Sequence, residues 1–198
     1  MNTLKAEKRD MSIKAKKLRR EGFVTGNLFG RELEDSIPLK FDKGEIEKLL
    51  KVENKGGQVM LEVAGETYDA LIKEVDYNPL KGYIDEIDFQ ALVSNEKVHS
   101  VAEIVLVNHD KLEAGVLQQH LEEISFRALP SALVDKIMVD VGDMKVGDVI
   151  KVKDLAIAQD KDVDLKTDLE AAVVSVAAVH VDPALEAEEE AAAEEEAK

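Results

Sequence analysis

The chain contains no cysteine and no tryptophan, and aromatic residues make up only 4% of its 198 residues. Without cysteine there are no disulfides, no zinc–thiolate site and no cysteine nucleophile, which fits a reducing compartment. With so few rings, the core must be aliphatic, and the hydrophobic content of 45% supplies it through Val, Ile and Leu. No apolar run of signal-peptide or membrane-span length follows Met1. We therefore expect a soluble, cytoplasmic protein with no membrane partner.

The sequence also lacks the usual signatures of catalysis. It contains no phosphate-binding loop, no dinucleotide-binding glycine fingerprint, no nucleophile elbow and no HExxH metal motif. Its four histidines, at positions 99, 109, 120 and 180, have no ligand-like spacing. We expect no enzyme activity, no metal, no cofactor and no small-molecule substrate.

Charge is strongly segregated along the chain, whose formal net charge is -16. Residues 1–31 hold nine basic and three acidic side chains, a local charge of +6, whereas residues 182–198 hold eight acids and one lysine, a local charge of -7. A basic segment on an acidic chain is most simply explained by phosphate, because each Lys or Arg that neutralises a phosphate releases a counterion. The alternative is a solvated helix end, since basic runs are common and non-specific.

The basic segment is predicted to include a short helix over residues 13–21, with Ser12 as its N-cap. Lys14, Lys17 and Leu18 share one side of this helix at i, i+3 and i+4 spacing. The helix can therefore present cations while Leu18 anchors it.

A second helix is predicted to begin after Asp42. Asp42 and Glu45 have the spacing of a capping box, and Phe41 and Ile46 that of a hydrophobic staple. These signals make it the best-defined helix in the sequence.

The remainder of the first 93 residues is predicted to form strands joined by turns. Pro38 cannot donate to a ladder, so its strand is expected at a sheet edge. Alternation in the last strand places Ile87 and Phe89 on one face, and Ile84, Glu86 and Asp88 on the other. This order of elements suits a small barrel; the predicted strands are Asn2–Lys8, Phe23–Phe29, Ile37–Phe41, Gln58–Val63, Thr67–Tyr77 and Tyr83–Val93.

The pattern changes near residue 94, where a domain boundary is expected. No convincing amphipathic helix follows, and glycine or proline separates the remaining strands. We predict a first domain over residues 1–93, an all-β second domain over residues 94–181, and a disordered acidic tail over residues 182–198. The predicted strands of the second domain are Val98–Asn108, His120–Ala128, Lys136–Val141, Val149–Val152 and Ala171–Val181.

Several ordered blocks of residues resemble a known family. They are Lys5-Ala6-Glu7-Lys8-Arg9, Lys17-Leu18-Arg19-Arg20-Glu21-Gly22, Asn27-Leu28-Phe29-Gly30, Leu71-Ile72-Lys73-Glu74-Val75, Asn78-Pro79-Leu80-Lys81-Gly82, Ile87-Asp88-Phe89, Ala114-Gly115-Val116-Leu117-Gln118-Gln119, Ala128-Leu129-Pro130 and Lys145-Val146-Gly147-Asp148. Over about residues 3–180 the chain is similar to the bacterial large-subunit ribosomal protein family called L-twenty-five, in its longer CTC, general-stress-protein form.

This resemblance implies a fold and a function. The fold would be a six-stranded β-barrel with two short helices, followed by an elongated all-β domain. The function would be ribosomal, with binding of 5S rRNA in the large subunit beside neighbouring large-subunit proteins. In the family, barrel side chains enter the wide minor groove of an RNA helix, which exposes base edges and 2′-hydroxyls.

The resemblance also implies which residues contact RNA. Arg9 stands where the family has an early RNA-contacting Arg, and Arg19 and Arg20 keep the basic pair before the glycine. Asp88 keeps the Asp of a His-x-Asp-Phe block, and Phe29 keeps the ring of a usual Tyr without its hydroxyl. With the helix cations Lys14 and Lys17, these residues form the candidate RNA-binding set.

Two further positions complete the candidate set and depart from the family pattern in charge. Asp76 occupies the place of a usual Gln and Glu86 that of the usual His. Both changes introduce potential anions, which repel phosphates unless they accept hydrogen bonds from base amino groups. A second hypothesis therefore stays open, that of a divergent stress-linked paralogue acting as a protein-interaction module with weak or no RNA binding.

Overall fold

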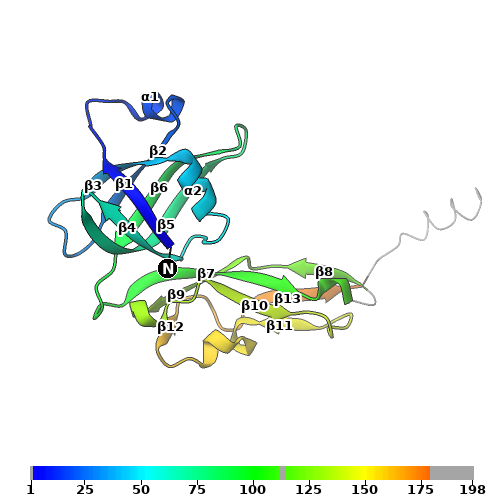
Figure 1. The fold of residues 1–198 in the computed structure, drawn as a ribbon. Helices are drawn as coiled ribbons and strands as arrows, with labels where there is room; N and C mark the ends of the chain where they lie inside the picture. Colours follow the sequence, from blue (N-terminus) through cyan, green and yellow to red (C-terminus); the bar gives the residue numbers. More distant parts are fainter. Residues whose placement is uncertain (1, 112–114, 179–198) are drawn as a thin grey trace, which may run out of the picture.

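The computed structural model describes residues 2–111 and 115–178. Its first half is a closed six-stranded barrel with strand order β1-β3-β2-β6-β5-β4 and two short helices, as expected (Figure 1). Two of the barrel's strand pairings are parallel, β1 with β4 and β2 with β6, and the others are antiparallel. The elements are β1 (Asn2–Lys8), α1 (Ala15–Arg20), β2 (Phe23–Phe29), β3 (Ile37–Asp42), α2 (Lys43–Leu49), β4 (Gln58–Val63), β5 (Glu66–Asn78) and β6 (Tyr83–Ala91).

The barrel core is mainly aliphatic, as the composition predicts. Its one aromatic contact joins Phe41 and Phe89, whose ring centroids are 5.3 Å apart. Leu28, Leu39 and Ile72 are fully buried around them. The inward-facing side chains, at every second position of each strand, fill the interior. The barrel is therefore a packed core and not a channel.

The two helices differ in how well their starts were predicted. Asp42 Oδ1 accepts hydrogen bonds from the Gly44 and Glu45 amides at 2.8 and 3.2 Å, which confirms the predicted cap of α2. The prediction that Ser12 caps the first helix is wrong. α1 begins at Ala15, and the Ser12 amide instead donates to Asp10 Oδ1 at 2.8 Å in a turn before the helix.

Two strand predictions also need correction. β3 is not an edge strand, because β1 and β2 flank it in the closed barrel, and Pro38 contributes its carbonyl to the Arg9 amide at 2.8 Å. Ile84 faces inward with 8% of its surface exposed, although alternation placed it with Glu86. The β5–β6 register shifts between Asp76 and Tyr77, leaving Asp85 as an extra residue that reverses the alternation.

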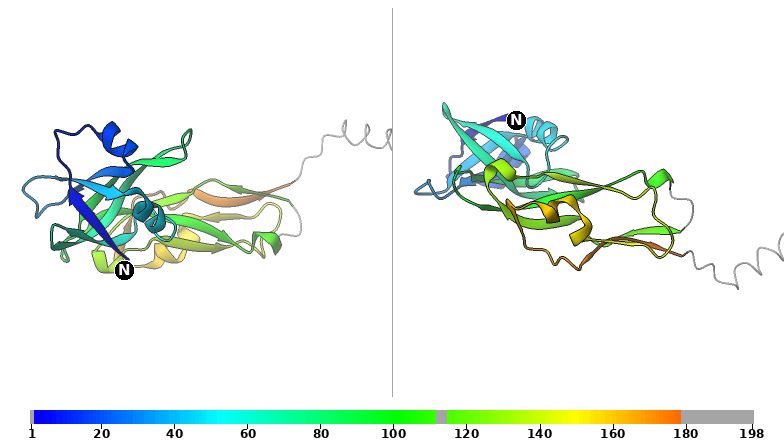
Figure 2. Two further views of the ribbon diagram at one scale, coloured as in Figure 1. Left: turned by 45° about the horizontal axis from the view of Figure 1, so that its top comes forward. Right: turned by 90° about the horizontal axis from the view of Figure 1, so that it is seen from below.

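The second half is an elongated all-β domain, as expected (Figure 2). One sheet has the order β10-β7-β9-β12 and the other β11-β13-β8, and a separate hydrophobic cluster lies between them. The short strands β8 and β12 were not predicted as separate strands. The strands are β7 (Val98–Val107), β8 (Val116–Gln119), β9 (Glu123–Ala128), β10 (Lys136–Asp140), β11 (Val149–Lys151), β12 (Val163–Leu165) and β13 (Ala172–Ala177), with single 3-10 turns at His109–Lys111, Pro130–Ala132, Val152–Asp154 and Ala156–Gln159.

The predicted acidic tail, residues 182–198, lies outside the described residues. In the part of the chain that the structure describes, no helix has the length and apolar character needed to cross a membrane.

Candidate nucleic-acid interface

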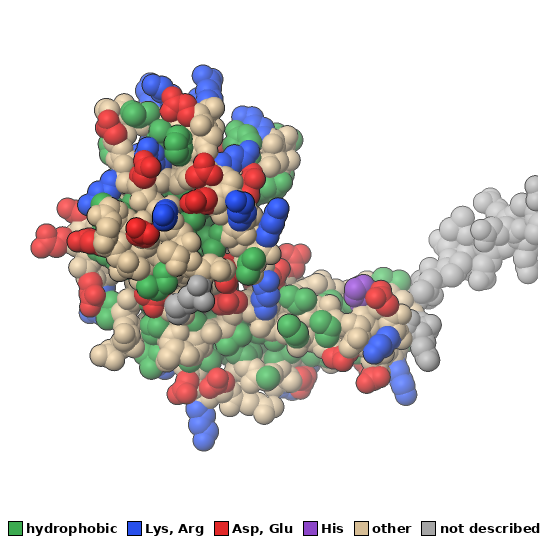
Figure 3. All heavy atoms as spheres, viewed as in Figure 1, with side chains coloured by type: hydrophobic (Ala, Val, Ile, Leu, Met, Phe, Trp, Pro, Cys, Tyr) green, Lys and Arg blue, Asp and Glu red, His purple; other side chains and the backbone are tan. Residues whose placement is uncertain are grey.

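The helix α1 carries four of the nine basic residues of the segment 1–31 and lies on the outside of the barrel against β2. Leu18 is its only buried residue and does not belong to the barrel core, so it attaches the helix to the outer surface. Figure 3 shows Lys and Arg side chains gathered around α1 and the tip of the β5–β6 hairpin, at the top of the molecule. One end of the barrel therefore carries a group of basic side chains, among which acidic side chains also lie.

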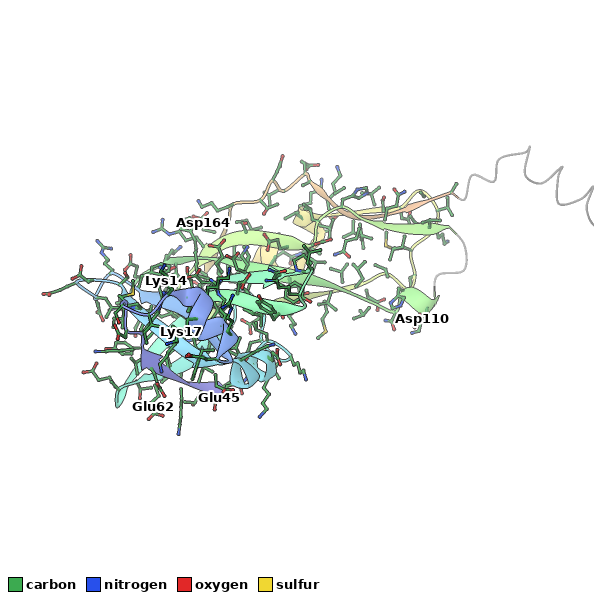
Figure 4. All side chains as sticks on the ribbon, turned by 90° about the horizontal axis from the view of Figure 1, so that it is seen from above. Lys14, Lys17, Glu45, Glu62, Asp110 and Asp164 are labelled. Carbon is green, nitrogen blue, oxygen red and sulfur yellow. The ribbon has the colours of Figure 1, made fainter. Side chains whose placement is uncertain are left out.

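The two helix cations expected to contact RNA are exposed. Figure 4 shows Lys14, the residue before α1, and Lys17, on α1, over the barrel. Lys17 Nζ lies 3.8 Å from Glu21 Oε1, with 68% of the Lys17 side chain exposed. A pair this exposed contributes little to stability, so Lys17 stays available to another anion.

A hollow of about 390 Å³ separates α1 from the β5–β6 hairpin. Four cations and one acid surround it, since its walls are formed by Lys16, Arg19, Arg20, Lys81, Tyr83 and Asp85. Of the predicted residues, Arg19 and Arg20 line it, whereas Lys14 and Lys17 do not. The excess of positive charge around a concave surface suits a phosphate-bearing ligand.

Arg19 forms the fixed wall of this hollow. Its Nε donates to the carbonyl of Asp85 at 3.0 Å, and its Nη1 lies 3.4 Å from Asp85 Oδ1. Asp85 is the extra residue of the β6 bulge, and its carboxylate also accepts from Asn78 Nδ2 at 3.1 Å. Arg19 is therefore bound to the barrel, while the exposed Lys16, Arg20 and Lys81 keep their charges toward solvent.

Sequence reasoning missed four residues of this hollow, because Lys16, Lys81, Tyr83 and Asp85 were not in the candidate set. The only local signal was the turn that carries Lys81, which lies more than 60 residues from α1 in the sequence. Lys81 Nζ lies 3.3 Å from the Tyr83 hydroxyl and 5.6 Å from the centre of its ring, so the hairpin supplies both a cation and an aromatic face.

Beside the hollow, the structure brings four of the other predicted residues together around Glu86. Asp76 is its partner across the β5–β6 ladder, and Asp88 lies two residues further along β6. Burial raises the pKa of the Glu86 carboxyl, and the charges of Asp88 and Asp76 add to the rise, while Arg19 and Arg9 oppose it. Three acids and two arginines thus lie near one another in a patch at the barrel surface.

Asp88 joins two strands as well as adding charge. Its Oδ1 accepts from the Asn27 amide at 2.9 Å and from Asn27 Nδ2 at 3.1 Å, which ties β6 to β2. Thr25 on β2 is the partner of Glu86 on β6. Phe29 lies four residues further along β2, a rise of about 13 Å, and 36% of its surface is exposed. The structure therefore places Phe29 at the far end of this patch.

Arg9 is held within the loop between β1 and α1. Its Nη2 donates to the carbonyl of Ile13 at 3.3 Å, and its Nε is buried without a hydrogen-bond partner among the described residues. A buried donor without a partner is costly, so its guanidinium is poised to gain from an additional acceptor. Arg9 both supports the loop and contributes charge to the Glu86 patch.

We expect Glu86→Gln to stabilise the protein at neutral pH. The pKa of Glu86 is higher in the folded than in the unfolded state. Its carboxyl therefore stabilises the fold at pH values below the unfolded-state pKa, and this contribution is lost as the pH rises through the folded-state pKa. At pH 7 the change removes a half-buried anion next to two others, a gain of up to about 1 kcal/mol after solvent screening. Melting temperatures at pH 7 and about pH 4 should show a gain only at the higher pH.

Glu34→Gln provides the matched control, because Glu34 is exposed on the loop between β2 and β3. This substitution should leave the difference between the two melting temperatures unchanged. A gain for Glu86→Gln that is equal at both pH values would contradict the electrostatic origin.

The fold and its charged surface define a class: two-domain, mainly-β proteins with a basic end on an N-terminal barrel. Within this class, two family models match the chain. The Ribosomal L25p family matches residues 4–89, and the domain described as ribosomal protein TL5, C-terminal domain, matches residues 97–180.

Individual relatives agree with these matches. A large ribosomal subunit protein bL25 from Thermoanaerobacter sp. is 31% identical over 179 residues, which cover 89% of this chain and 88% of the relative. A bL25 from Caldanaerobacter subterraneus is 30% identical over 88% of both chains, and one from Geobacillus thermodenitrificans is 34% identical over 71% of this chain and 67% of its own. The chain belongs to the bL25 family of ribosomal proteins, in the longer form that carries the second domain.

Proposed function

We propose that this protein is a structural, non-enzymatic constituent of the large ribosomal subunit that binds 5S rRNA through the basic end of its barrel. The relatives are named as large-subunit ribosomal proteins, which supports a ribosome-associated, cytoplasmic location and neighbouring large-subunit proteins as partners. The observation that carries the RNA proposal is the hollow between α1 and the β5–β6 hairpin, with its four cations.

The chemistry of the hollow fits an RNA backbone. Lys16, Arg20 and Lys81 are exposed point charges around a concavity, an arrangement that neutralises phosphates and releases counterions. The Tyr83 ring offers a surface on which an unpaired base can stack. Arg19 is already bound to Asp85, so its role is to hold α1 at the correct distance from the hairpin.

The neighbouring acidic patch is compatible with this function. Glu86 and Asp76 lie among Arg9 and Arg19 and not alone, so part of their charge is compensated. The carboxylate oxygens of Glu86 and Asp76 can accept hydrogen bonds from base amino groups. The site residues Arg9, Lys14, Lys17, Arg19, Arg20, Phe29, Asp76, Glu86 and Asp88 remain a proposed contact set, to which we add Lys16, Lys81 and Tyr83 because they line the hollow.

Titration of the purified chain with 5S rRNA at two salt concentrations tests the proposal. The wild-type protein should bind with a clear salt dependence. A triple variant, Lys16→Ala with Arg20→Ala and Lys81→Ala, should bind at least about tenfold more weakly at the lower salt concentration. Its logarithmic salt slope should be smaller by roughly one for each phosphate that the variant no longer neutralises.

A control with the same loss of charge separates direct binding from overall electrostatics. Lys111→Ala with Lys145→Ala and Lys161→Ala removes three exposed cations from the second domain and should leave the salt slope unchanged. If both triple variants lower RNA affinity and the salt slope equally, the hollow acts only through long-range charge and does not contact the RNA directly. Weak binding by the wild-type chain, no stronger than to an unrelated structured RNA, would instead favour the divergent-paralogue hypothesis.

A further inference from the structure

The two domains meet at the loop between α2 and β4, on the side of the barrel away from α1 (Figure 1). Lys136 Nζ of the second domain lies 3.4 Å from the carbonyl of Val52, and the Asn54 side chain donates to the Glu103 carboxylate. A side-chain carbon at Gly56 would lie 2.0 Å from the carbonyl of Val101. Only glycine allows the loop to approach β7 so closely.

A cavity of about 260 Å³ opens at this junction. Since a water occupies about 30 Å³ in the liquid, the cavity is large enough for a small solute with several waters. The barrel contributes Lys55 and Lys73 to its lining, and the second domain contributes His99, Ser100 and Lys166. Three lysines from both domains therefore converge on one hollow, in a protein whose net charge is -16.

Lys73 is directed into this cavity by a bulge. The β5–β6 register shifts between Ile72 and Glu74, so Lys73 leaves the regular alternation of the strand. Its Nζ donates to the carbonyl of His99 at 2.8 Å, and an ammonium group has two further donors. Burial and the charge of Lys55 lower the pKa of Lys73, and none of the ion pairs found in the described part of the chain involves it.

The other two lysines have weak partners. Lys55 Nζ lies 3.5 Å from Glu123, and Lys166 Nζ lies 3.2 Å from Asp164. Figure 4 places Asp164 at the barrel end of the second domain, far from Asp110 at the opposite end. In both pairs the carboxylate side chain is 52% exposed, so water competes with the interaction.

A buried hydroxyl at the cavity also lacks a good hydrogen-bond partner. Ser100 also lines the cavity, although only 6% of its surface is exposed. The only hydrogen bond of its Oγ within the described residues is a long one of 3.5 Å to the neighbouring carbonyl of Val101. A buried polar group with so poor a partner gains from a ligand acceptor nearby.

We propose that this interdomain cavity is an anion site that binds a phosphate group between Lys55, Lys73 and Lys166, and so links the two domains. A tetrahedral oxyanion supplies further acceptors to the ammonium groups and a better one to the Ser100 hydroxyl. The phosphate comes either from an RNA backbone or from a small phosphorylated molecule. The site is separate from the hollow beside α1 and does not require 5S rRNA binding at that end of the barrel.

Titration of the isotopically labelled full-length chain with inorganic phosphate, at constant ionic strength maintained with chloride, tests the site. The amide signals of Gly56 and Ser100 should shift and saturate with a dissociation constant on the order of 1 mM or lower. Lys73→Met should raise that constant about tenfold or more, as expected for the loss of a charge-assisted hydrogen bond. Lys73→Arg, which keeps the charge, should restore part of the affinity.

Lys73→Met is not expected to misfold, because it replaces a half-buried cation with an apolar side chain of similar length. Lys145→Met, which removes one exposed cation elsewhere on the second domain, should bind phosphate like the wild type. No saturable shift up to about 50 mM phosphate, some fiftyfold above the expected constant, would overturn the proposal. An unchanged constant for Lys73→Met would do the same.

A second experiment, which measures 5S rRNA binding by Lys73→Met, identifies the source of the phosphate. If an RNA backbone occupies the cavity, Lys73→Met should weaken RNA binding several-fold and phosphate should compete with the RNA. If a small phosphorylated molecule is the ligand, RNA affinity should not change, while phosphate binding still depends on Lys73. Both results support the anion site and differ only in what brings the phosphate.

Discussion

Replacing Gly26 with alanine is expected to unfold the barrel. Gly26 lies on β2 opposite Ile87 of β6, and a side-chain carbon there would sit 1.8 Å from the Ile87 carbonyl oxygen and 3.2 Å from the ring of Phe41. The obstacle is backbone in a closed barrel, so it cannot move without breaking the parallel β2–β6 pairing. We expect a cost of about 4 kcal/mol or more, a large part of the roughly 5–15 kcal/mol that stabilises a typical domain.

The same variant tests the division of the chain, because we propose that residues 1–93 and 94–181 fold as separate units. Each has its own hydrophobic cluster, and no buried residue is shared between the two clusters. Amide hydrogen exchange of Gly26→Ala should therefore show loss of protection in β1 to β6, with protection retained in β7, β9 and β10.

Gly44→Ala is the control for the glycine change. Gly44 lies in the first turn of α2, where the nearest atom to an added carbon is the flexible Asp42 carboxylate at 3.2 Å. Alanine also favours the helix, so this variant should keep its protection. Full protection of the barrel in Gly26→Ala would contradict the packing argument, and loss of protection in both halves would contradict separate folding.

Features fixed by local interactions could be predicted from the sequence. The start of α2 depends on Asp42 and its own next three residues, and it was predicted correctly. The strands of the barrel were also recognisable, because their apolar residues recur at period two. The resemblance to a known family supplied the number of barrel strands and the elongated second domain.

Features that depend on tertiary pairing could not be predicted in this way. Pro38 indicated an edge strand, but closure of the barrel gives β3 a neighbour on both sides. Ile84 was placed on the wrong face because the bulge at Asp85 is set by pairing with β5, and its one mark in the sequence is Asp85 itself, an acid on the otherwise apolar face of the strand. The three-residue strand β12 is too short for a periodic signal.

The candidate site shows the same division. The concentration of cations in the first 31 residues was evident from composition, and Arg19 and Arg20 do line the hollow. The participation of Lys81 and Tyr83 depends on a hairpin that folds back beside α1, which brings together segments more than 60 residues apart. The mixture of arginines and acids around Glu86 likewise joins segments that are distant in the sequence, because the acids lie on β5 and β6, whereas Arg9 lies in the loop before α1 and Arg19 on α1.

Leu18→Ala is expected to weaken 5S rRNA binding without changing any charge. Leu18 is 4% exposed and is the only buried residue of α1, a six-residue helix too short to be stable in isolation. Truncation of a buried leucine costs about 2–5 kcal/mol, and here the cost falls on the docking of the helix rather than on the barrel core. Arg19, held by Asp85, would be the main remaining attachment.

An undocked helix still carries Lys16, Arg19 and Arg20, but no longer holds them across the hollow from Lys81. The RNA must then order the helix as it binds, which subtracts the docking free energy from the binding free energy. Affinity for 5S rRNA should therefore fall about tenfold or more, while the salt slope stays close to that of the wild type because the same phosphates are neutralised once the helix is ordered. Amide exchange should show loss of protection in α1 with the barrel strands unaffected. Met11→Ala, at a site 68% exposed in the preceding loop, should bind normally. Wild-type affinity for Leu18→Ala, with α1 shown to be undocked, would mean that the position of the helix on β2 does not matter for binding.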